Sequence, residues 1–265
     1  MYLIFDTETT GLPRDFNAPI TDTDNWPRVV QIAWQLHDDM GNMVEHKDYL
    51  VRPDGFSIPY QSEQIHGIST ELAQEQGIPL DQMLEEFKEV LSRSKFVVGQ
   101  NIKFDINVMG CELFRREVDT PMMDMPVLDT CTETTAELCQ IPGGRGGKFK
   151  LPTLTELHEH LFGEPFGEAH NATADVEATT RCFLELIRRK QFTLDQLQKE
   201  PGYFELYREN NDHPFEPVGL THLNLKAESE KIKKALGVEE IDESISDTDA
   251  ARNLEALADV SYSHL

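Results

Sequence analysis

The chain lacks the features that mark membrane and secreted proteins. No stretch of its 265 residues approaches the roughly eighteen consecutive apolar residues that a membrane-spanning helix needs. The start, Met1–Asp6, has neither the basic beginning nor the long apolar core of a signal peptide. The four cysteines form no CxxC pair and no zinc-ligand spacing. These absences predict a reduced, cytoplasmic protein that does not associate with membranes.

Basic residues are scarce as well. The 24 Lys and Arg stand against 48 Asp and Glu, which gives a net charge of −24. Phosphate binding normally depends on Lys and Arg, so this balance argues against a nucleic-acid partner unless positive charge is supplied locally. Bound metal ions or a small basic patch would supply it.

Short apolar runs alternate with helical patterns along most of the chain, whose 39% hydrophobic content suffices for one α/β domain and an appendage. The runs predict strands over 2–6, 29–36, 43–51, 95–99 and 126–129. Apolar residues spaced three and four apart predict helices over 80–91, 104–116, 154–162 and 172–189. Three strands followed by alternating strands and helices predict a mixed sheet with helices on its faces.

The pattern weakens after about residue 190. Residues 191–225 form short, proline-punctuated segments, and a helix is expected over 227–236. The stretch 239–249 is acidic and poor in apolar residues, which predicts a solvated linker. We therefore expect one domain over 1–190 and a helical and linker extension over 191–265.

Acidic residues stand at the ends of predicted strands and the starts of predicted helices. Asp6 ends the first predicted strand, and if the strand continues to Glu8, its two-residue period points both side chains to one face. Asp105 follows the fourth strand, and Asp175 lies just after His170 in the first turn of a long helix. Each also has a simpler explanation on its own. Acidic pairs at the spacing of Asp6 and Glu8 occur by chance in so acidic a chain, and Asp105 would stabilise the dipole of the helix that it begins. Asn171 would cap the long helix, with His170 as a surface loop residue.

Together these segments resemble one known family. They are Phe5–Leu12 (FDTETTGL), Gln64–Ile68 (QIHGI), Asn101–Asp105 (NIKFD), Leu128–Thr130 (LDT) and His170–Asp175 (HNATAD). Their order, context and local sequence resemble the DnaQ-like 3′-to-5′ exonucleases of the DEDDh subclass, over about residues 1–190. Within that family, the chain is most similar to the proofreading exonucleases of bacterial DNA polymerase III.

The resemblance implies an α/β fold of the ribonuclease H-like type, a five-stranded mixed sheet with one antiparallel strand and flanking helices. It also implies a site for two Mg²⁺ or Mn²⁺ ions, hard cations that prefer oxygen ligands. The implied metal ligands are Asp6, Glu8, Asp105 and Asp175, and His170 is the implied general base. The two cations would offset the repulsion among four carboxylates and between them and an anionic phosphodiester.

The resemblance further implies contacts to the terminal nucleotide. The candidates follow the first motif or belong to the others: Thr7, Thr9, Thr10, Leu12, His66 and Phe104. Ordinary packing is the alternative for Leu12 and Phe104. The implied reaction releases nucleoside 5′-monophosphates from a single-stranded or frayed DNA 3′ end, beside a replicative DNA polymerase in the same or another chain.

One segment is basic in an otherwise acidic chain. The glycine-rich stretch 142–150 carries Arg145, Lys148 and Lys150 but lacks the spacing of a nucleotide-binding P-loop. We interpret it as a mobile loop that contacts the DNA backbone, with a solvated hairpin as the alternative. His158 and His160 stand two residues apart on a predicted helix and point away from each other, so a solvent-facing surface is expected there rather than a metal site.

The final residues, Ser261–Leu265 (SYSHL), resemble the opening of a polymerase-and-histidinol-phosphatase-type domain. We therefore expect the chain to be the amino-terminal part of a longer polymerase polypeptide. Two other functions stay open at this stage. An RNA-trimming exonuclease of the same family would carry the same motifs, and a catalytically inactive module would bind partners through the acidic surface.

Overall fold

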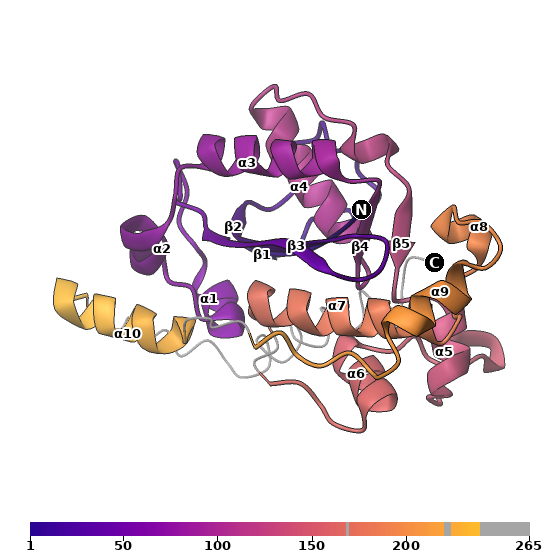
Figure 1. Ribbon diagram of the computed structural model, residues 1–265. Helices are drawn as coiled ribbons and strands as arrows, with labels where there is room; N and C mark the ends of the chain where they lie inside the picture. Colours follow the sequence, from indigo (N-terminus) through magenta and orange to yellow (C-terminus); the bar gives the residue numbers. More distant parts are fainter. Residues whose placement is uncertain (168–169, 220–223, 239–265) are drawn as a thin grey trace.

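A computed structural model describes residues 1–167, 170–219 and 224–238 of the chain. The predicted acidic linker 239–249 and the tail Ser261–Leu265 lie outside these residues. None of the helices in the described part combines the length and the apolar composition that a membrane span requires. One sheet forms the centre of the molecule, and helices cover both of its faces (Figure 1).

The sheet contains five strands: β1 Tyr2–Thr9, β2 Val29–His37, β3 Met43–Leu50, β4 Phe96–Gly99 and β5 Val127–Asp129. Their order is β3-β2-β1-β4-β5. β2 is antiparallel to β1 and β3, whereas β4 is parallel to β1 and β5. A single strand, β2, therefore opposes the others. This confirms the predicted five-stranded mixed sheet with one antiparallel strand.

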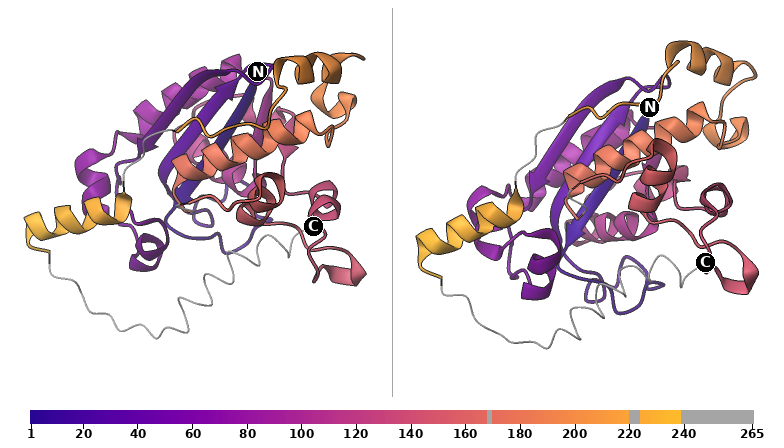
Figure 2. Two further views of the ribbon diagram at one scale, coloured as in Figure 1. Left: turned by 60° about the horizontal axis from the view of Figure 1, so that its bottom comes forward. Right: turned by 90° about the horizontal axis from the view of Figure 1, so that it is seen from below.

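Four longer helices cover the two faces of the sheet (Figures 1 and 2). α3 Leu80–Arg93 and α4 Lys103–Arg115 pack on one face, and α6 Leu154–Phe162 and α7 Ala172–Arg188 pack on the other. All four were predicted to within two residues. Shorter helices that were not predicted are α1 Tyr60–His66, α2 Thr70–Gln76, α5 Glu133–Cys139, α8 Leu194–Leu197 and α9 Tyr203–Asn210, with single 3₁₀ turns at Met122–Asp124 and Arg145–Gly147.

The alternation of side chains along β1 divides the core into two layers. Leu3 and Phe5 pack with α3 and α4. Tyr2 and Ile4 pack with α6 and α7. Because a strand repeats every two residues, Asp6 and Glu8 continue on the α7 side of the sheet, beyond the apolar part of the strand. The fold therefore carries two carboxylates to the place where α7 begins.

The chain after residue 190 packs against the same body. Phe192, Leu197, Tyr203 and Tyr207 share a buried cluster with α6 and α7. The last described helix, α10 Leu225–Leu236, begins two residues before its predicted start and lies beside α1 and α2 (Figures 1 and 2). The apolar core thus continues past residue 190, and the domain boundary proposed there stays a prediction.

The expected solvent-facing position of His158 is wrong. Its side chain is buried, while His160, two residues further along α6, is exposed. The Nδ1–H of His158 donates to the Glu164 carbonyl (2.8 Å), and Nε2 accepts from the Arg181 guanidinium (2.8 Å). Burial is tolerated because both ring nitrogens are paired, and the arginine partner comes from α7, far away in the sequence.

Candidate active site

A cavity of about 710 Å³ opens where β1 ends and where α4 and α7 begin. Side chains from three separate parts of the chain meet there because the carboxyl ends of parallel strands face the same edge of the sheet. All five residues proposed from the sequence as catalytic line this cavity: Asp6, Glu8, Asp105, His170 and Asp175.

Three of the four carboxylates form a compact cluster. One oxygen each from Asp6, Glu8 and Asp175 lies within 4.8 Å of the others. Asp6 and Glu8 come from the same face of β1, and Asp175 comes from the first turn of α7. A set of carboxylate oxygens at this separation matches the ligand preference of Mg²⁺ and Mn²⁺. The cluster is therefore suited to hold a divalent cation.

Asp105 lies beside the cluster and is held in place by β1. Its Oδ1 accepts hydrogen bonds from the Thr7 amide (3.0 Å) and the Thr7 hydroxyl (2.6 Å). Thr7 alternates with Asp6 and Glu8 on the strand, so its side chain faces α4 instead of α7. Thr7 was predicted to contact the nucleotide. The structure places it at the cavity wall, 7% exposed and bonded to a carboxylate.

Burial raises the pKa of all four carboxyls. The pKa of Asp6 and that of Glu8 lie well above their usual values, and repulsion from the neighbouring carboxylates adds to the effect of burial. Burial likewise raises the pKa of Asp105 to about 7, although the bonds from Thr7 oppose the shift. The pKa of Asp175 also rises to about 7. Four neighbouring carboxyls are hard to ionise at the same time, because their negative charges repel one another. A bound cation offsets this repulsion, so the cluster favours cation binding.

His170 stands next to this cluster, just before α7. Its backbone has a φ of +69°, and its amide donates to Asp175 Oδ2 (2.9 Å). The following residue, Asn171, caps the helix by accepting a hydrogen bond from the Thr173 amide (3.1 Å), as its position suggested. Desolvation lowers the pKa of the His170 imidazole, so the ring is neutral at neutral pH and able to accept a proton.

A polar network ties the start of α7 to the sheet. The side-chain oxygen of Gln31 on β2 accepts from the Ala172 amide (3.2 Å), and its amide nitrogen donates to Asp48 on β3 (3.0 Å). The Thr173 hydroxyl donates to the same carboxylate of Asp48. These bonds fix the helix end that carries Asp175. The sequence gives no sign of this role, because Gln31 is one polar residue inside an apolar strand.

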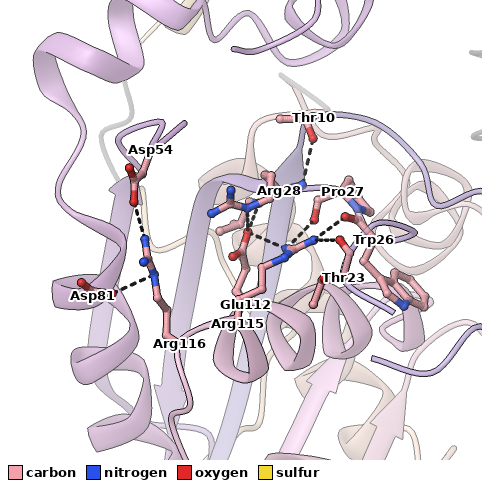
Figure 3. A network of polar contacts seen from close by, with 11 residues as sticks. Thr10, Thr23, Trp26, Pro27, Arg28, Asp54, Asp81, Glu112, Arg115 and Arg116 are labelled. Carbon is pink, nitrogen blue, oxygen red and sulfur yellow. Dashed lines mark hydrogen bonds and ion pairs between the residues drawn. The ribbon is translucent and has the colours of Figure 1, made fainter. Parts of the chain in front are cut away.

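A second network fixes the loop that follows β1 (Figure 3). The Thr10 amide donates to the Arg28 carbonyl (2.9 Å), and the Arg28 amide donates to the Thr10 hydroxyl (2.9 Å). The Arg28 side chain donates to Glu112 (2.8 Å), which is fully buried. Arg115 also pairs with Glu112 (3.3 Å) and donates to the carbonyls of Thr23 and Trp26. Helix α4 thus carries Asp105 at its start and holds this loop at its end.

Asp129, at the end of β5, has a structural role. Its carboxylate accepts from the amides of Asn101 (2.8 Å), Ile102 (3.2 Å) and Cys131 (2.7 Å). Asn101 has a φ of +55°, so the turn before α4 depends on such support. Asp129 therefore stabilises the start of the helix that carries Asp105.

The other proposed substrate contacts also line the cavity: Thr9, Thr10, Leu12, His66 and Phe104. His66 is buried, and its Nδ1 accepts from the Ile68 amide (3.1 Å), so the neutral ring carries its proton on Nε2, which has no hydrogen-bond partner among the described residues. Residues at the cavity that were not predicted include Ser62, Ile65, Leu154 and Phe166. Only Ile65 had a signal, since it belongs to the QIHGI segment.

The basic loop does not reach the cavity. Arg145, Lys148 and Lys150 are absent from its lining. Lys148 pairs with Glu133, and Lys150 pairs with Glu156 (2.8 Å). Among the described residues, Arg145 makes no ion pair. Two of the three cations on this loop are therefore already neutralised by carboxylates of the same chain.

Comparisons with known proteins agree with this geometry. Residues 3–183 match the exonuclease family RNase_T. The PolC-type DNA polymerase III of Streptococcus pneumoniae is 26% identical over 240 residues, which cover 91% of this chain and 14% of that protein. The PolC-type polymerase of Streptococcus thermophilus is 30% identical over 188 residues, or 71% of this chain and 11% of that protein. The chain thus spans only a small part of the length of these relatives.

Solved structures support the same fold. A structure of Escherichia coli exonuclease I has a TM-score of 0.56 and 21% sequence identity, and the match covers 77% of this chain and 42% of that one. A likeness at this identity concerns the fold, which is ribonuclease H-like as expected. The family match, by contrast, spans residues 3–183 and therefore includes the whole carboxylate cluster. The chain belongs to the DnaQ-like exonuclease family.

Proposed function

We propose that this chain is a metal-dependent 3′-to-5′ exodeoxyribonuclease that releases nucleoside 5′-monophosphates one at a time. The main support is the convergence of Asp6, Glu8 and Asp175 within 4.8 Å, with Asp105 beside them and His170 next to Asp175. An inactive binding module would have no reason to keep carboxylates with raised pKa values in one cavity, because their repulsion destabilises the fold.

The donor set fits divalent cations. Two Mg²⁺ or Mn²⁺ ions held by Asp6, Glu8, Asp105 and Asp175 would polarise the scissile phosphate and stabilise the departing 3′ oxygen. They would also supply positive charge that a chain with a net charge of −24 otherwise lacks. The protein contributes by holding these oxygens in place: Thr7 fixes Asp105, and the Gln31 network fixes the start of α7.

His170 is the proposed general base. A ring nitrogen of the neutral imidazole would take the proton from the water that attacks the phosphorus. The bond from the His170 amide to Asp175 keeps the residue beside the carboxylates (2.9 Å). The lowered pKa of the imidazole keeps the ring unprotonated at neutral pH.

The proposed substrate is a single-stranded or frayed DNA 3′ end. The cavity has apolar walls at Leu12, Ile65, Phe104 and Phe166, which suit the faces of unpaired bases. Two of the E. coli exonuclease I structures that share this fold are complexes with dA16 and dT13 oligonucleotides. Because the relatives in sequence are PolC-type polymerases, we assign the activity to proofreading beside a replicative polymerase, in the cytoplasm.

A labelled-strand assay tests the proposal. A single-stranded DNA carrying a 5′ label should shorten stepwise from the 3′ end in Mg²⁺ or Mn²⁺ and stay intact in EDTA, and the products should be 5′-mononucleotides. Asp6→Asn should abolish the ladder. Asp119→Asn, at an exposed position, makes the same change of charge and should not affect it. Shortening from the 5′ end, or a stronger reaction with RNA of the same sequence, would contradict the proposed direction or substrate.

A further inference from the structure

Helix α10 buries a narrow stripe against the amino-terminal domain. Leu225, Ser229 and Ile232, at helical spacings of four and three, are 5%, 3% and 5% exposed. The two apolar residues join a cluster with Ile68 and Leu72, which lie next to α1 and within α2. Most of the remaining α10 side chains are exposed. The helix therefore docks through one face, beside α1 (Figure 1).

The partner of this face includes a wall of the cavity. Helix α1 contributes Gln61, Ser62, Ile65 and His66 to the cavity lining, and it ends at Gly67. The Ser229 hydroxyl donates to the Gly67 carbonyl (2.6 Å) and accepts from the Ser69 amide (3.0 Å). Near the middle of α1, the Glu63 carboxylate pairs with Lys233. Helix α10 thus contacts α1 at two points.

The turn after His66 is shaped to receive α10. Gly67 has a φ of +76°, and a Cβ at this position would lie 2.9 Å from the Lys226 backbone nitrogen. A residue with a side chain would be strained there and would also push α10 away. The backbone of α10 therefore lies in direct contact with the residue that follows His66.

Helix α1 has little stability of its own. It has seven residues, and its N-cap is Pro59, which makes no side-chain capping bond. Isolated helices of this length do not persist in water, so α1 depends on tertiary contacts. The carboxylates, in contrast, are held by β1, α4 and α7. Loss of the α10 contacts would loosen the wall that carries Ile65 and His66 without displacing the carboxylates.

We propose that α10 is a positioning element for the nucleotide-binding wall, with Ser229 and Lys233 as positioning residues, so that seating of the carboxyl-terminal extension controls affinity for the DNA 3′ end. This inference rests on the proposed exonuclease function. It gives residues 224–238 a role in substrate binding.

A charge-swap experiment in the full chain tests the inference. Lys233→Glu and Glu63→Lys should each raise KM for a single-stranded DNA about fivefold to tenfold and change kcat less than about twofold, since the wall moves but the carboxylates do not. The double variant should return KM to within about twofold of wild type by restoring the pair. Lys234→Glu is the matched control, because it makes the same charge change on an exposed neighbour.

Two further readouts keep the outcomes separate. Hydrogen exchange of the α1 amides should rise in Lys233→Glu and return in the double variant, and Ser229→Ala should raise KM about threefold if the charge variants fold poorly. Equal KM values for Lys233→Glu and Lys234→Glu, or no recovery in the double variant, would overturn the inference. Wild-type protein without nuclease activity would instead remove the proposed function, while the exchange data would still report on α10.

Discussion

Neutralising one carboxylate of the cluster should stabilise the metal-free protein. In the Asp175→Asn variant, the amide oxygen can still accept from the His170 amide, so the main change is the loss of one buried charge. Burial raises the pKa of Asp175 from 3.8 to about 7. Because the folded-state pKa is the higher one, the carboxyl stabilises the fold while protonated, and this contribution disappears as the pH rises from about 4 to about 7.

The size of the effect follows from the shift. A rise in the pKa of Asp175 from 3.8 to about 7 corresponds to a loss of about 4 kcal/mol in the free energy of unfolding at high pH. Because Asp175 interacts with Asp6 and Glu8, part of this free energy belongs to the whole cluster. We therefore expect Asp175→Asn to stabilise the metal-free protein by about 2–4 kcal/mol at pH 8. For a protein of this size the melting temperature should rise by about 5–10 °C. The gain should be largest above pH 7 and shrink toward pH 4, where the wild-type carboxyl is protonated as well.

Thermal unfolding in EDTA across this pH range measures the effect directly. Adding Mg²⁺ or Mn²⁺ at pH 8 should raise the melting temperature of the wild type and have little effect on Asp175→Asn, which lacks a ligand. The exposed control Asp119→Asn should follow the wild type in both conditions. If Asp175→Asn melts below the wild type in EDTA at pH 8, the argument that these carboxylates repel one another in the empty cluster is refuted.

Three further predictions concern the base, the buried network and the basic loop. His170→Ala should lower kcat by about 10²–10⁴-fold in the strand-shortening assay. The melting temperature should stay within about 2 °C of wild type, because His170 lines the cavity and lies outside the apolar core. Turnover near wild type would exclude His170 as the base. Glu112→Gln leaves Arg28 and Arg115 beside a neutral group, so the free energy of unfolding in urea should fall by about 2–3 kcal/mol. The control Glu117→Gln, at an exposed position, should lower it by less than about 0.5 kcal/mol. Equal effects of the two changes would contradict the importance of the Glu112 network. Arg145→Glu should weaken DNA binding and reduce the slope of log affinity against log salt concentration by about one. Lys148→Glu should weaken binding less, because Lys148 already pairs with Glu133. If Arg145→Glu leaves the slope unchanged, the basic loop does not contact the DNA.

The long elements were predictable because their patterns extend over several turns. Helix α7 repeats apolar residues along its whole length, and its ends were predicted to within one residue. The first strand was expected to end at Asp6 but continues to Thr9, because Glu8 pairs with Gln31 on β2. An apolar run in the sequence shows which part of a strand is buried. It does not show how far the backbone hydrogen bonds to the neighbouring strand continue beyond the apolar residues.

The short helices were missed for a related reason. α1, α2 and α5 have seven residues each, about two turns, which is too short to establish a helical period. Contacts made far along the chain hold them, as α10 does for α1. Such contacts depend on the topology and leave no local pattern in the sequence.

The candidate site likewise has features that follow from local sequence and features that depend on contacts between distant residues. The placement of Asp6 and Glu8 on one face follows from local periodicity. The bond between Thr7 and Asp105 joins residues 98 positions apart, and the bond between Gln31 and Ala172 joins residues 141 apart. Nothing in the sequence marks Glu112, and His158 was expected on a solvent-facing surface. Both are buried because an arginine from another element pairs with each of them.

The central claim is that these distant carboxylates form one cation-binding site. Anomalous diffraction from a crystal soaked in Mn²⁺ tests it most directly. We predict two manganese peaks within coordination distance of Asp6, Glu8, Asp105 and Asp175, in the cavity beside His170. A map with no peak at these side chains, or carboxylates that point to separate regions of the protein, would contradict the account.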